Sequence, residues 1–228
     1  MQTALATTDF PLAPNAALLL RGIPSPKPAE APALGSTRIV AKDEQIFTEG
    51  DRAAYFYKVV SGAVRTSKLL SDGRRQIDAF HLAGDIFGIE SGDEHRFTAE
   101  ALGTATVIMY RRCSLETLAC GDAGFARQVV AAMMRSLERA QDHMLLLGRK
   151  SAMEKIATFL LDMAERVAGD DHVDLPMSRT DIADHLGLTI ETVSRSLTQL
   201  ERQGVIELPA HRRTIMLRNK AALRHLDA

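Results

Sequence analysis

Hydrophobic residues recur with helical spacing on both sides of Gly187, and this pattern predicts two short helices separated by a tight turn. The apolar positions of the two helices are Ile182, Ala183, Leu186, Val193, Leu197 and Leu200. Ser178 followed by Asp181 is a capping-box pattern, which satisfies free backbone amides where the first helix begins. Gly187 suits a left-handed turn, and Thr189 can cap the second helix. We therefore predict a helix-turn-helix.

The second predicted helix also has a polar side made of residue types that read DNA. Its members follow the spacing i, i+3, i+4 and i+7 and are Glu191, Ser194, Arg195 and Thr198. In a DNA major groove, Arg195 can donate two hydrogen bonds to guanine, and Glu191 can accept one from the amino group of cytosine or adenine. Ser194 and Ile190 are assigned to thymine. The alternative is that the polar residues only form the solvated side of an amphipathic helix.

Five further residues are predicted to contact DNA phosphates. They are Arg179, Thr180, Thr189, Arg212 and Arg213. The first three lie where the two helices begin, and backbone amides at helix N-termini bind phosphate. Short apolar runs at 206–208 and 214–217 predict a hairpin wing, whose loop carries the two neighbouring arginines. The alternative is a basic loop without a role in binding.

A second apolar pattern lies between Val130 and Leu147 and has the 3.5-residue repeat of a coiled coil. Its members, spaced by three and four residues in turn, are Val130, Met133, Leu137, Ala140, Met144 and Leu147. One long helix over 119–148 would present these residues as a narrow stripe. We predict that two such helices pair side by side and make the protein a homodimer. The alternative is that the stripe packs on the chain's own β domain, since Met-rich stripes usually belong to a core.

Short runs with β-like alternation fill the chain from Arg38 to Arg112, separated by glycines and acidic turns. Two of them, 64–70 and 76–82, flank the residues 71–74, whose sequence Ser-Asp-Gly-Arg is a strong hairpin signal. Strands of this kind predict a compact antiparallel roll. The predicted fold class is therefore α+β, with an N-terminal antiparallel β-roll, a long dimerisation helix and a C-terminal winged helix-turn-helix.

The same patterns divide the chain into four segments. Residues 1–37 hold six of its eight prolines and are predicted to form a tail with little regular structure. The β-roll is placed at 38–118, the dimerisation helix at 119–148 and the winged helix-turn-helix domain at 149–228. The last of these begins with a further amphipathic helix, whose inward positions are Ile156, Phe159, Leu160 and Met163.

Composition narrows the class of protein further. The formal net charge is -1, so bulk electrostatics does not indicate a nucleic-acid partner, and the placement of individual residues carries that prediction. The two cysteines, Cys113 and Cys120, predict neither a disulfide framework nor a zinc ribbon. No stretch has the length and apolarity of a signal peptide or membrane span, so we expect a soluble, cytoplasmic protein without membrane contact. Nothing indicates an enzyme, because the chain lacks a phosphate-binding glycine loop, a metal-ligand pair and a nucleophile with a base.

The order of roll, long helix and winged helix-turn-helix resembles the Crp/Fnr family of bacterial transcription regulators over residues 38–220. Residues 49–62 look like the first strands of a cyclic-nucleotide-binding roll, and residues 84–88 look like its central glycine motif. Residues 191–195 are similar to the Fnr and FixK branch, in which glutamate, serine and arginine read a TTGAT half-site. The cyclic-AMP branch has an arginine at the position of Ile190. The resemblance therefore implies a TTGAT-N4-ATCAA-like palindrome.

Two departures from the family concern its known switches. Cyclic-AMP binders have a glutamate at the position of Ile89 and an Arg-Ser pair at that of Phe97-Thr98, so cyclic-nucleotide binding is not expected. No cysteine precedes Cys113, so an iron–sulfur cluster of the Fnr type is not expected either. The resemblance is to FixK-type members, which lack both devices and act in nitrogen-fixing or microaerobically respiring bacteria. Such proteins are mainly activators that contact RNA polymerase.

The remaining candidate residues leave alternatives open. Cys113 and Cys120 fit small buried hydrophobes, with redox sensing as the alternative. His81, His95 and His143 lack the spacing of a metal site, so neither a metal nor a cofactor is expected. His143 is interpreted as a surface residue beside the apolar stripe, with a haem ligand as the alternative. For the whole chain, the competing functions are a related regulator gated by a small ligand, haem-bound gas or redox state, and a ligand-binding dimer whose helix-turn-helix contacts protein.

Overall fold

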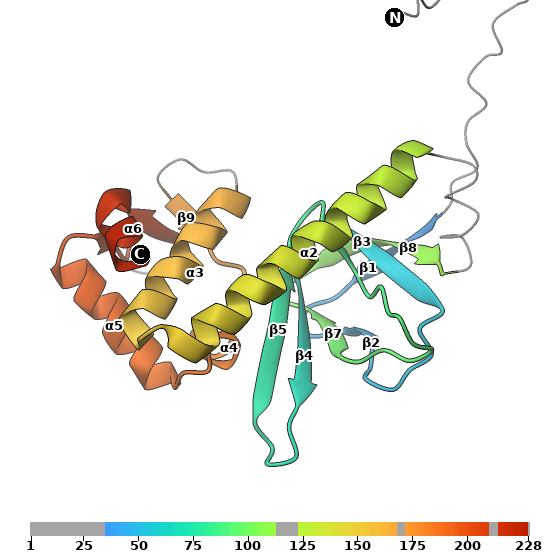
Figure 1. The fold of residues 1–228 in the computed structure, drawn as a ribbon, viewed down its shortest axis with the longest axis horizontal. Coiled ribbons are helices and arrows are strands. Elements are labelled where there is room, and N and C mark those ends of the chain that lie inside the picture. The colour runs from blue at the N-terminus through green and yellow to red at the C-terminus, as the bar shows by residue number, and fades with distance from the viewer. Residues whose placement is uncertain (1–34, 113–122, 168–171, 210–213, 228) are drawn as a thin grey trace, which may run out of the picture. The chain divides into compact units, whose positions relative to one another are not determined.

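The computed structural model describes residues 35–112, 123–167, 172–209 and 214–227. All of them belong to one compact unit of the chain. Strands come first, a long helix follows, and a smaller part of helices and short strands completes the chain (Figure 1). This order confirms the predicted α+β fold class.

The first part consists of two four-stranded antiparallel sheets. In spatial order, the first sheet contains β1 (Gly35–Val40), β8 (Ala105–Arg111), β3 (Tyr55–Ser61) and β6 (Ile86–Phe87). The second contains β2 (Gln45–Phe47), β7 (Thr98–Ala101), β4 (Val64–Leu69) and β5 (Arg75–His81). Inward residues of both sheets share one core, which includes Phe47, Tyr57, Val64 and Val107. This arrangement is the predicted β-roll.

The hairpin of β4 and β5 shows how locally the turn is specified. Its register runs from Val64 opposite His81 to Leu69 opposite Arg75, within one residue of the predicted strand limits. Gly73 has a φ of 84°, a conformation that favours glycine, and the Asp72 carboxylate accepts a hydrogen bond from the backbone amide of Arg74 at 3.0 Å. The tip of this hairpin projects beyond the other strands of the roll (Figure 1).

The long helix α2 (Ala123–Arg149) packs one side against the roll. Val129 and Ala132 on this side are buried with Phe56 and Tyr110 of the first sheet, and Phe56 stacks on Tyr110 with ring centroids 5.1 Å apart. The predicted helix is therefore present from residue 123 onward. Among the helices that the structure describes, none combines the length and apolarity needed to cross a membrane.

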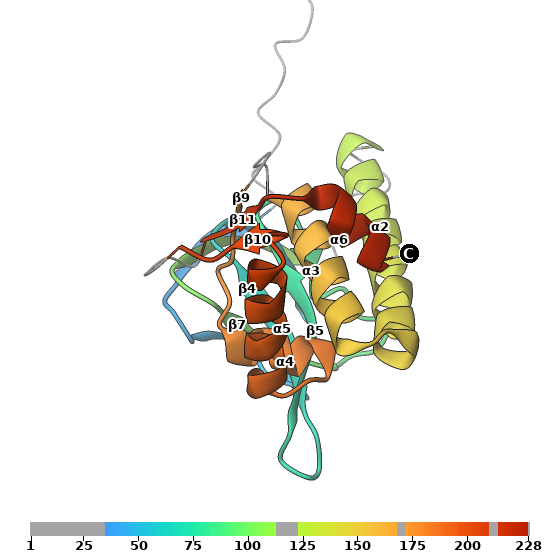
Figure 2. The same ribbon diagram turned by 90° about the vertical axis from the view of Figure 1, so that its left-hand side faces the viewer.

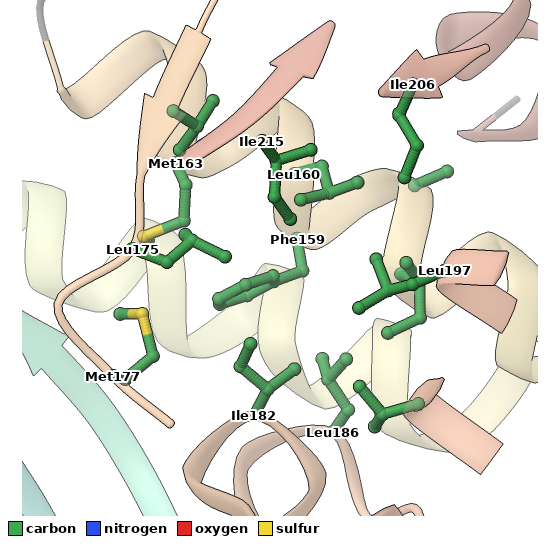
Figure 3. Packing of buried hydrophobic residues seen from close by; sticks show 14 of the residues in the cluster. Phe159, Leu160, Met163, Leu175, Met177, Ile182, Leu186, Leu197, Ile206 and Ile215 are labelled. Carbon is green, nitrogen blue, oxygen red and sulfur yellow. The ribbon is translucent and has the colours of Figure 1, made fainter. Parts of the chain in front are cut away.

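The C-terminal part is a small helical domain closed by a three-stranded sheet. Its elements are α3 (Ala152–Arg166), β9 (His172–Asp174), α4 (Arg179–Leu186), α5 (Ile190–Arg202), β10 (Ile206–Glu207), β11 (Thr214–Leu217) and α6 (Lys220–Asp227). Side chains from α3, α4, α5 and the sheet converge on one core (Figure 3). The four predicted inward residues of α3 are all buried, which confirms that pattern: Ile156, Phe159, Leu160 and Met163. The strand β9 and the helix α6 were not predicted.

Candidate nucleic-acid interface

The helix α4 begins and ends as its sequence predicts. The Ser178 hydroxyl accepts a hydrogen bond from the Asp181 amide at 3.1 Å, and the Asp181 carboxylate accepts one from the Ser178 amide at 2.9 Å. At the other end, Gly187 has a φ of 61° and turns the chain toward α5. The Thr189 hydroxyl then accepts a hydrogen bond from the Thr192 amide at 3.2 Å and caps α5. The helix-turn-helix is thus fixed by local contacts.

The helix α5 has one buried side and one open side. Val193, Leu197 and Leu200 are at most 2 % exposed, which confirms their predicted inward position. On the open side, Glu191 and Arg195 are exposed, Ile190 is 42 % exposed, and Ser194 and Thr198 are half-buried. In Figure 2, α5 lies at the surface of the helical domain, and no other described element covers it. The open side of α5 is therefore accessible to a binding partner.

Two of the predicted DNA contacts lie against each other. Arg179, the first residue of α4, donates a hydrogen bond from Nη1 to the Ser194 hydroxyl on α5 at 3.4 Å. Thr180 and Thr189 are exposed near the beginnings of the two helices, where the first backbone amides of a helix lack partners within the helix. The candidate base-reading and phosphate-contacting residues of α4 and α5 therefore form one continuous surface.

The predicted wing is present as the antiparallel pair of β10 and β11, with Ile206 opposite Leu217. Arg212 and Arg213, predicted to contact phosphate, lie outside the described residues, as do Cys113 and Cys120. The third strand of this sheet, β9, pairs with β11 through Val173 opposite Ile215 and was missed. Three residues are too few to show the alternation that identifies a strand.

The side of α4 that faces away from α5 is attached to the roll by ion pairs that the sequence pattern did not reveal. Asp181 Oδ1 lies 3.0 Å from Arg65 Nη1 and 2.7 Å from Arg75 Nη2, and Asp184 Oδ2 lies 2.8 Å from Arg75. Burial acts to raise the pKa of Asp181, but hydrogen bonds from Ser178 and the charges of the two arginines outweigh it and lower the pKa. Asp181 is therefore held ionised between the two domains.

Histidines occupy the same junction, and one of them corrects a prediction. His143, expected at the surface of α2, is half-buried: its ring stacks on His185 with centroids 4.0 Å apart, and its Nε2 donates to the His185 carbonyl at 2.8 Å. His185 in turn donates from Nδ1 to the Ile77 carbonyl at 3.1 Å. Burial, followed by the nearby charge of His143, lowers the pKa of His185 to about 3. The described residues contain no group of three or more side chains that could hold a metal ion.

The outward side of α2 carries the whole apolar stripe. Its six members are exposed: Val130, Met133, Leu137, Ala140, Met144 and Leu147. Different residues, Val129, Ala132 and Leu146, face the body of the protein. The stripe is therefore not buried on the chain's own β domain, although Met133, Leu137 and Ala140 also line the cavity beside the roll. Exposed fractions of 58 % at Val130 and 67 % at Met144 mean that more than half of each of these side chains is open to solvent.

The roll contains a cavity of about 420 Å³ beside α2, at the position where the family resemblance would place a cyclic nucleotide. Its ionisable lining includes Asp78, Glu90, His81 and Arg96, and burial raises the pKa of Asp78. Thr98, at the place of the family's serine, already accepts a hydrogen bond from the Glu49 amide at 3.0 Å. These residues do not fit a cyclic phosphate, because Phe97 lines the cavity at the place of the family's arginine and the charged partner of the phosphate is missing there.

A β-roll, a long helix and a helix-turn-helix with an uncovered second helix define a DNA-binding transcription regulator. Family models agree: the Crp-like helix-turn-helix domain matches residues 154–226, and the cyclic nucleotide-binding domain matches residues 37–119. The chain belongs to the Crp/Fnr family and is a regulator of FixK type, which is not an enzyme.

Three comparisons support this assignment. The chain is 48 % identical over 210 residues to the nitrogen fixation regulation protein FixK of Azorhizobium caulinodans, covering 90 % of this chain and 84 % of the relative. It is 43 % identical to the protein of that name from Rhizobium meliloti, covering 88 % of this chain and 90 % of the relative. Its fold matches the structure of FixK2 from Bradyrhizobium japonicum with a TM-score of 0.79 and 53 % identity, covering 85 % of this chain and 98 % of that one.

Proposed function

We propose that the protein is a homodimer that binds a TTGAT-N4-ATCAA-like palindrome and activates genes of microaerobic metabolism or nitrogen fixation. The observation that carries the proposal is the open side of α5, where Ile190, Glu191 and Arg195 are exposed and Ser194 is half-buried between them. Arg195 is assigned to guanine, Glu191 to the amino group of cytosine or adenine, and the other two to thymine. Apolar contact at Ile190 favours a thymine methyl where an arginine would favour guanine.

Dimerisation is supported by the exposed stripe of α2. Apolar side chains in a 3.5-residue repeat are stabilised when the same stripe of a second helix covers them, at roughly 25 cal/mol per Å² of buried apolar surface. A two-fold dimer through α2 carries two α5 helices, which matches a palindrome read in two successive major grooves. Arg179, Thr180, Thr189, Arg212 and Arg213 are proposed as the phosphate contacts that set the register of each helix.

The regulatory output and target genes rest on the relatives. Proteins 43 % to 48 % identical to this chain are named nitrogen fixation regulation proteins, and another at 43 % identity, from Rhodopseudomonas palustris, is named a transcriptional activatory protein. We infer activation by contact with RNA polymerase in the cytoplasm.

Fluorescence anisotropy with labelled duplexes tests the DNA-binding proposal. At physiological salt, the TTGAT palindrome should be bound about 10³-fold more tightly than a scrambled palindrome of the same composition, because base contacts add to the phosphate contacts that both duplexes offer. A duplex with one intact and one scrambled half-site should be bound with intermediate affinity. Equal affinity for all three duplexes would contradict the proposal.

A further inference from the structure

Four charged side chains join the roll to the helix-turn-helix. Arg65 on β4 and Arg75 on β5 face Asp181 and Asp184 on α4, and we call these four residues the interdomain ion cluster. The side chains of Arg65 and Asp181 are only 10 % and 6 % exposed. Ion pairs with so little exposure are screened weakly by salt, and a buried charge that loses its partner is strongly destabilising.

Each side of the cluster is held rigidly by its own domain. Arg65 Nε donates to Glu100 on β7 at 3.1 Å, so the guanidinium is fixed by the roll before it meets α4. Asp181 is fixed by its reciprocal hydrogen bonds with Ser178 at the beginning of α4. The cluster therefore joins two preorganised surfaces. The side chains of Arg65 and Asp181 are already held in place by their own domains when the contact between the domains forms.

Hydrogen bonds from side chains to backbone carbonyls, one turn further along α4, also attach this helix to the roll. The Gln76 side-chain amide donates to the His185 carbonyl at 3.2 Å, and the His185 ring donates to the Ile77 carbonyl at 3.1 Å. The eight-residue helix is thus held at both ends. It can neither pivot on the hairpin nor slide along it. The β4–β5 hairpin thus determines the orientation of α4.

The orientation of α4 determines that of α5, because the two helices share the buried residues Ile182, Leu186 and Val193 and the fixed turn at Gly187. From these contacts we propose that Arg65 and Arg75 are positioning residues for DNA reading. Through Asp181 and Asp184 they hold α5 at a fixed angle to the roll, and in the dimer this angle sets the distance between the two reading helices. The inference rests on the proposed binding of a palindrome and adds the residues that fix its spacing.

The test measures affinity against spacer length. Palindromes with spacers of 3, 4, 5 and 6 base pairs are titrated with the wild-type protein and with Arg75→Gln, whose side chain is 28 % exposed and therefore less critical for folding than Arg65. We expect the wild type to prefer one spacer. In Arg75→Gln, affinity for that spacer should fall about tenfold while affinity for a single half-site stays unchanged, so that the profile becomes flatter.

Three further variants make the result specific. Arg74→Gln removes the same charge from the neighbouring residue, which is 78 % exposed and pairs with Asp72 rather than with α4, and should keep the wild-type profile. Arg75→Lys retains a cation facing α4 and should restore part of the preference. Asp184→Asn combined with Arg75→Gln should flatten the profile no more than Arg75→Gln alone, because Arg75→Gln already removes the partner of Asp184.

The outcomes separate this inference from the proposed function. A wild-type protein that does not distinguish the TTGAT palindrome from a scrambled one overturns both. A wild type that distinguishes them, with an Arg75→Gln profile of unchanged shape, overturns only the positioning role. An equal loss of affinity at every spacer and at the half-site also overturns it, because that pattern indicates general destabilisation.

Discussion

At the scale of single residues, the open side of α5 carries two charged side chains, one hydroxyl and one apolar side chain as its candidate base contacts. Arg195 and Glu191 are exposed and point from the first two turns of the helix, the part that reaches base edges in helix-turn-helix complexes. Ser194 is half-buried and already accepts a hydrogen bond from Arg179. Discrimination between bases should therefore depend most on the two charged side chains.

Replacing Arg195 with alanine tests this directly. The variant should bind the TTGAT palindrome about 1 to 3 kcal/mol more weakly and lose discrimination at the guanine position, because the bidentate contact is gone. Anisotropy titrations against palindromes with each base at that position provide the measurement. Arg224→Ala removes an equal charge from an exposed position on α6 and serves as the control. An Arg195→Ala protein that still selects guanine would contradict the assignment.

His185 predicts a dependence of folding stability on pH. Its pKa is lowered from 6.5 to about 3, so the folded protein disfavours the charged ring. The contribution of this group is complete above pH 6.5 and is lost as the pH falls below that value, because the unfolded chain then binds a proton that the folded chain does not. Between pH 7 and pH 5 the loss should be about 2 kcal/mol.

Urea unfolding at the two pH values measures this loss. In His185→Asn, whose amide can still donate to the Ile77 carbonyl, the difference between pH 7 and pH 5 should be smaller than in the wild type by that amount. His225→Asn, at an exposed position of α6, should leave the difference unchanged. Equal differences in all three proteins would show that His185 does not carry the effect.

At the scale of elements, α2 has two apolar sides with different roles. The side with Val129 and Ala132 is buried on the roll, whereas the side with Leu137 is open. A globular helix needs only one apolar side, and an exposed second one favours association. The stripe predicted from the 3.5-residue repeat is the exposed side, and its role as a dimer interface stays a prediction.

Leu137→Glu should therefore disrupt the dimer. A carboxylate at the centre of the stripe is buried without a partner when two helices pair, and its desolvation opposes association. Analytical ultracentrifugation should show a monomer, and the affinity for the full palindrome should fall toward that for a half-site. Gln128→Glu adds a carboxylate elsewhere on the exposed surface of α2 and should leave the dimer intact. A dimer that persists in Leu137→Glu would refute the role of the stripe.

The sequence predicted those elements whose signals are local. The capping box at Ser178, the turn at Gly187 and the hairpin around Gly73 depend on residues within a few positions of each other, and all three are present. By contrast, β9 is too short for its periodicity to be visible. The pairing of Arg65 with Asp181 joins residues 116 positions apart, and only the tertiary fold brings them together.

At the scale of the whole molecule, the roll has the architecture of a cyclic-nucleotide-binding domain without the matching chemistry. Its sheets and cavity are retained, while Phe97 lies in the cavity at the place of the family's phosphate-binding arginine. The roll nevertheless supports the DNA-binding domain through the β4–β5 hairpin and through α2. The positioning role proposed for Arg65 and Arg75 would make the roll a structural support for the reading helix.

Cyclic AMP should accordingly have no effect at physiological concentrations. Both the thermal unfolding midpoint and the affinity for the palindrome should stay unchanged on its addition, because a ligand stabilises a protein only as far as it binds the folded state. Isothermal titration calorimetry gives a direct measure of binding. Heat of binding at micromolar nucleotide, or a rise in the midpoint, would show that the cavity accepts the phosphate despite its carboxylates.

The pairing of β9 with β11 has a consequence for synthesis on the ribosome. The two strands enclose α4, α5 and β10 in sequence, so the sheet closes only after Thr214–Leu217 has left the exit tunnel. The strands of the roll are complete about a hundred residues earlier, and domains fold as units while the chain emerges. A nascent chain therefore has a folded roll well before it has a folded DNA-binding domain. Ribosomes that stop before residue 214 release a chain that cannot complete the sheet of its DNA-binding domain.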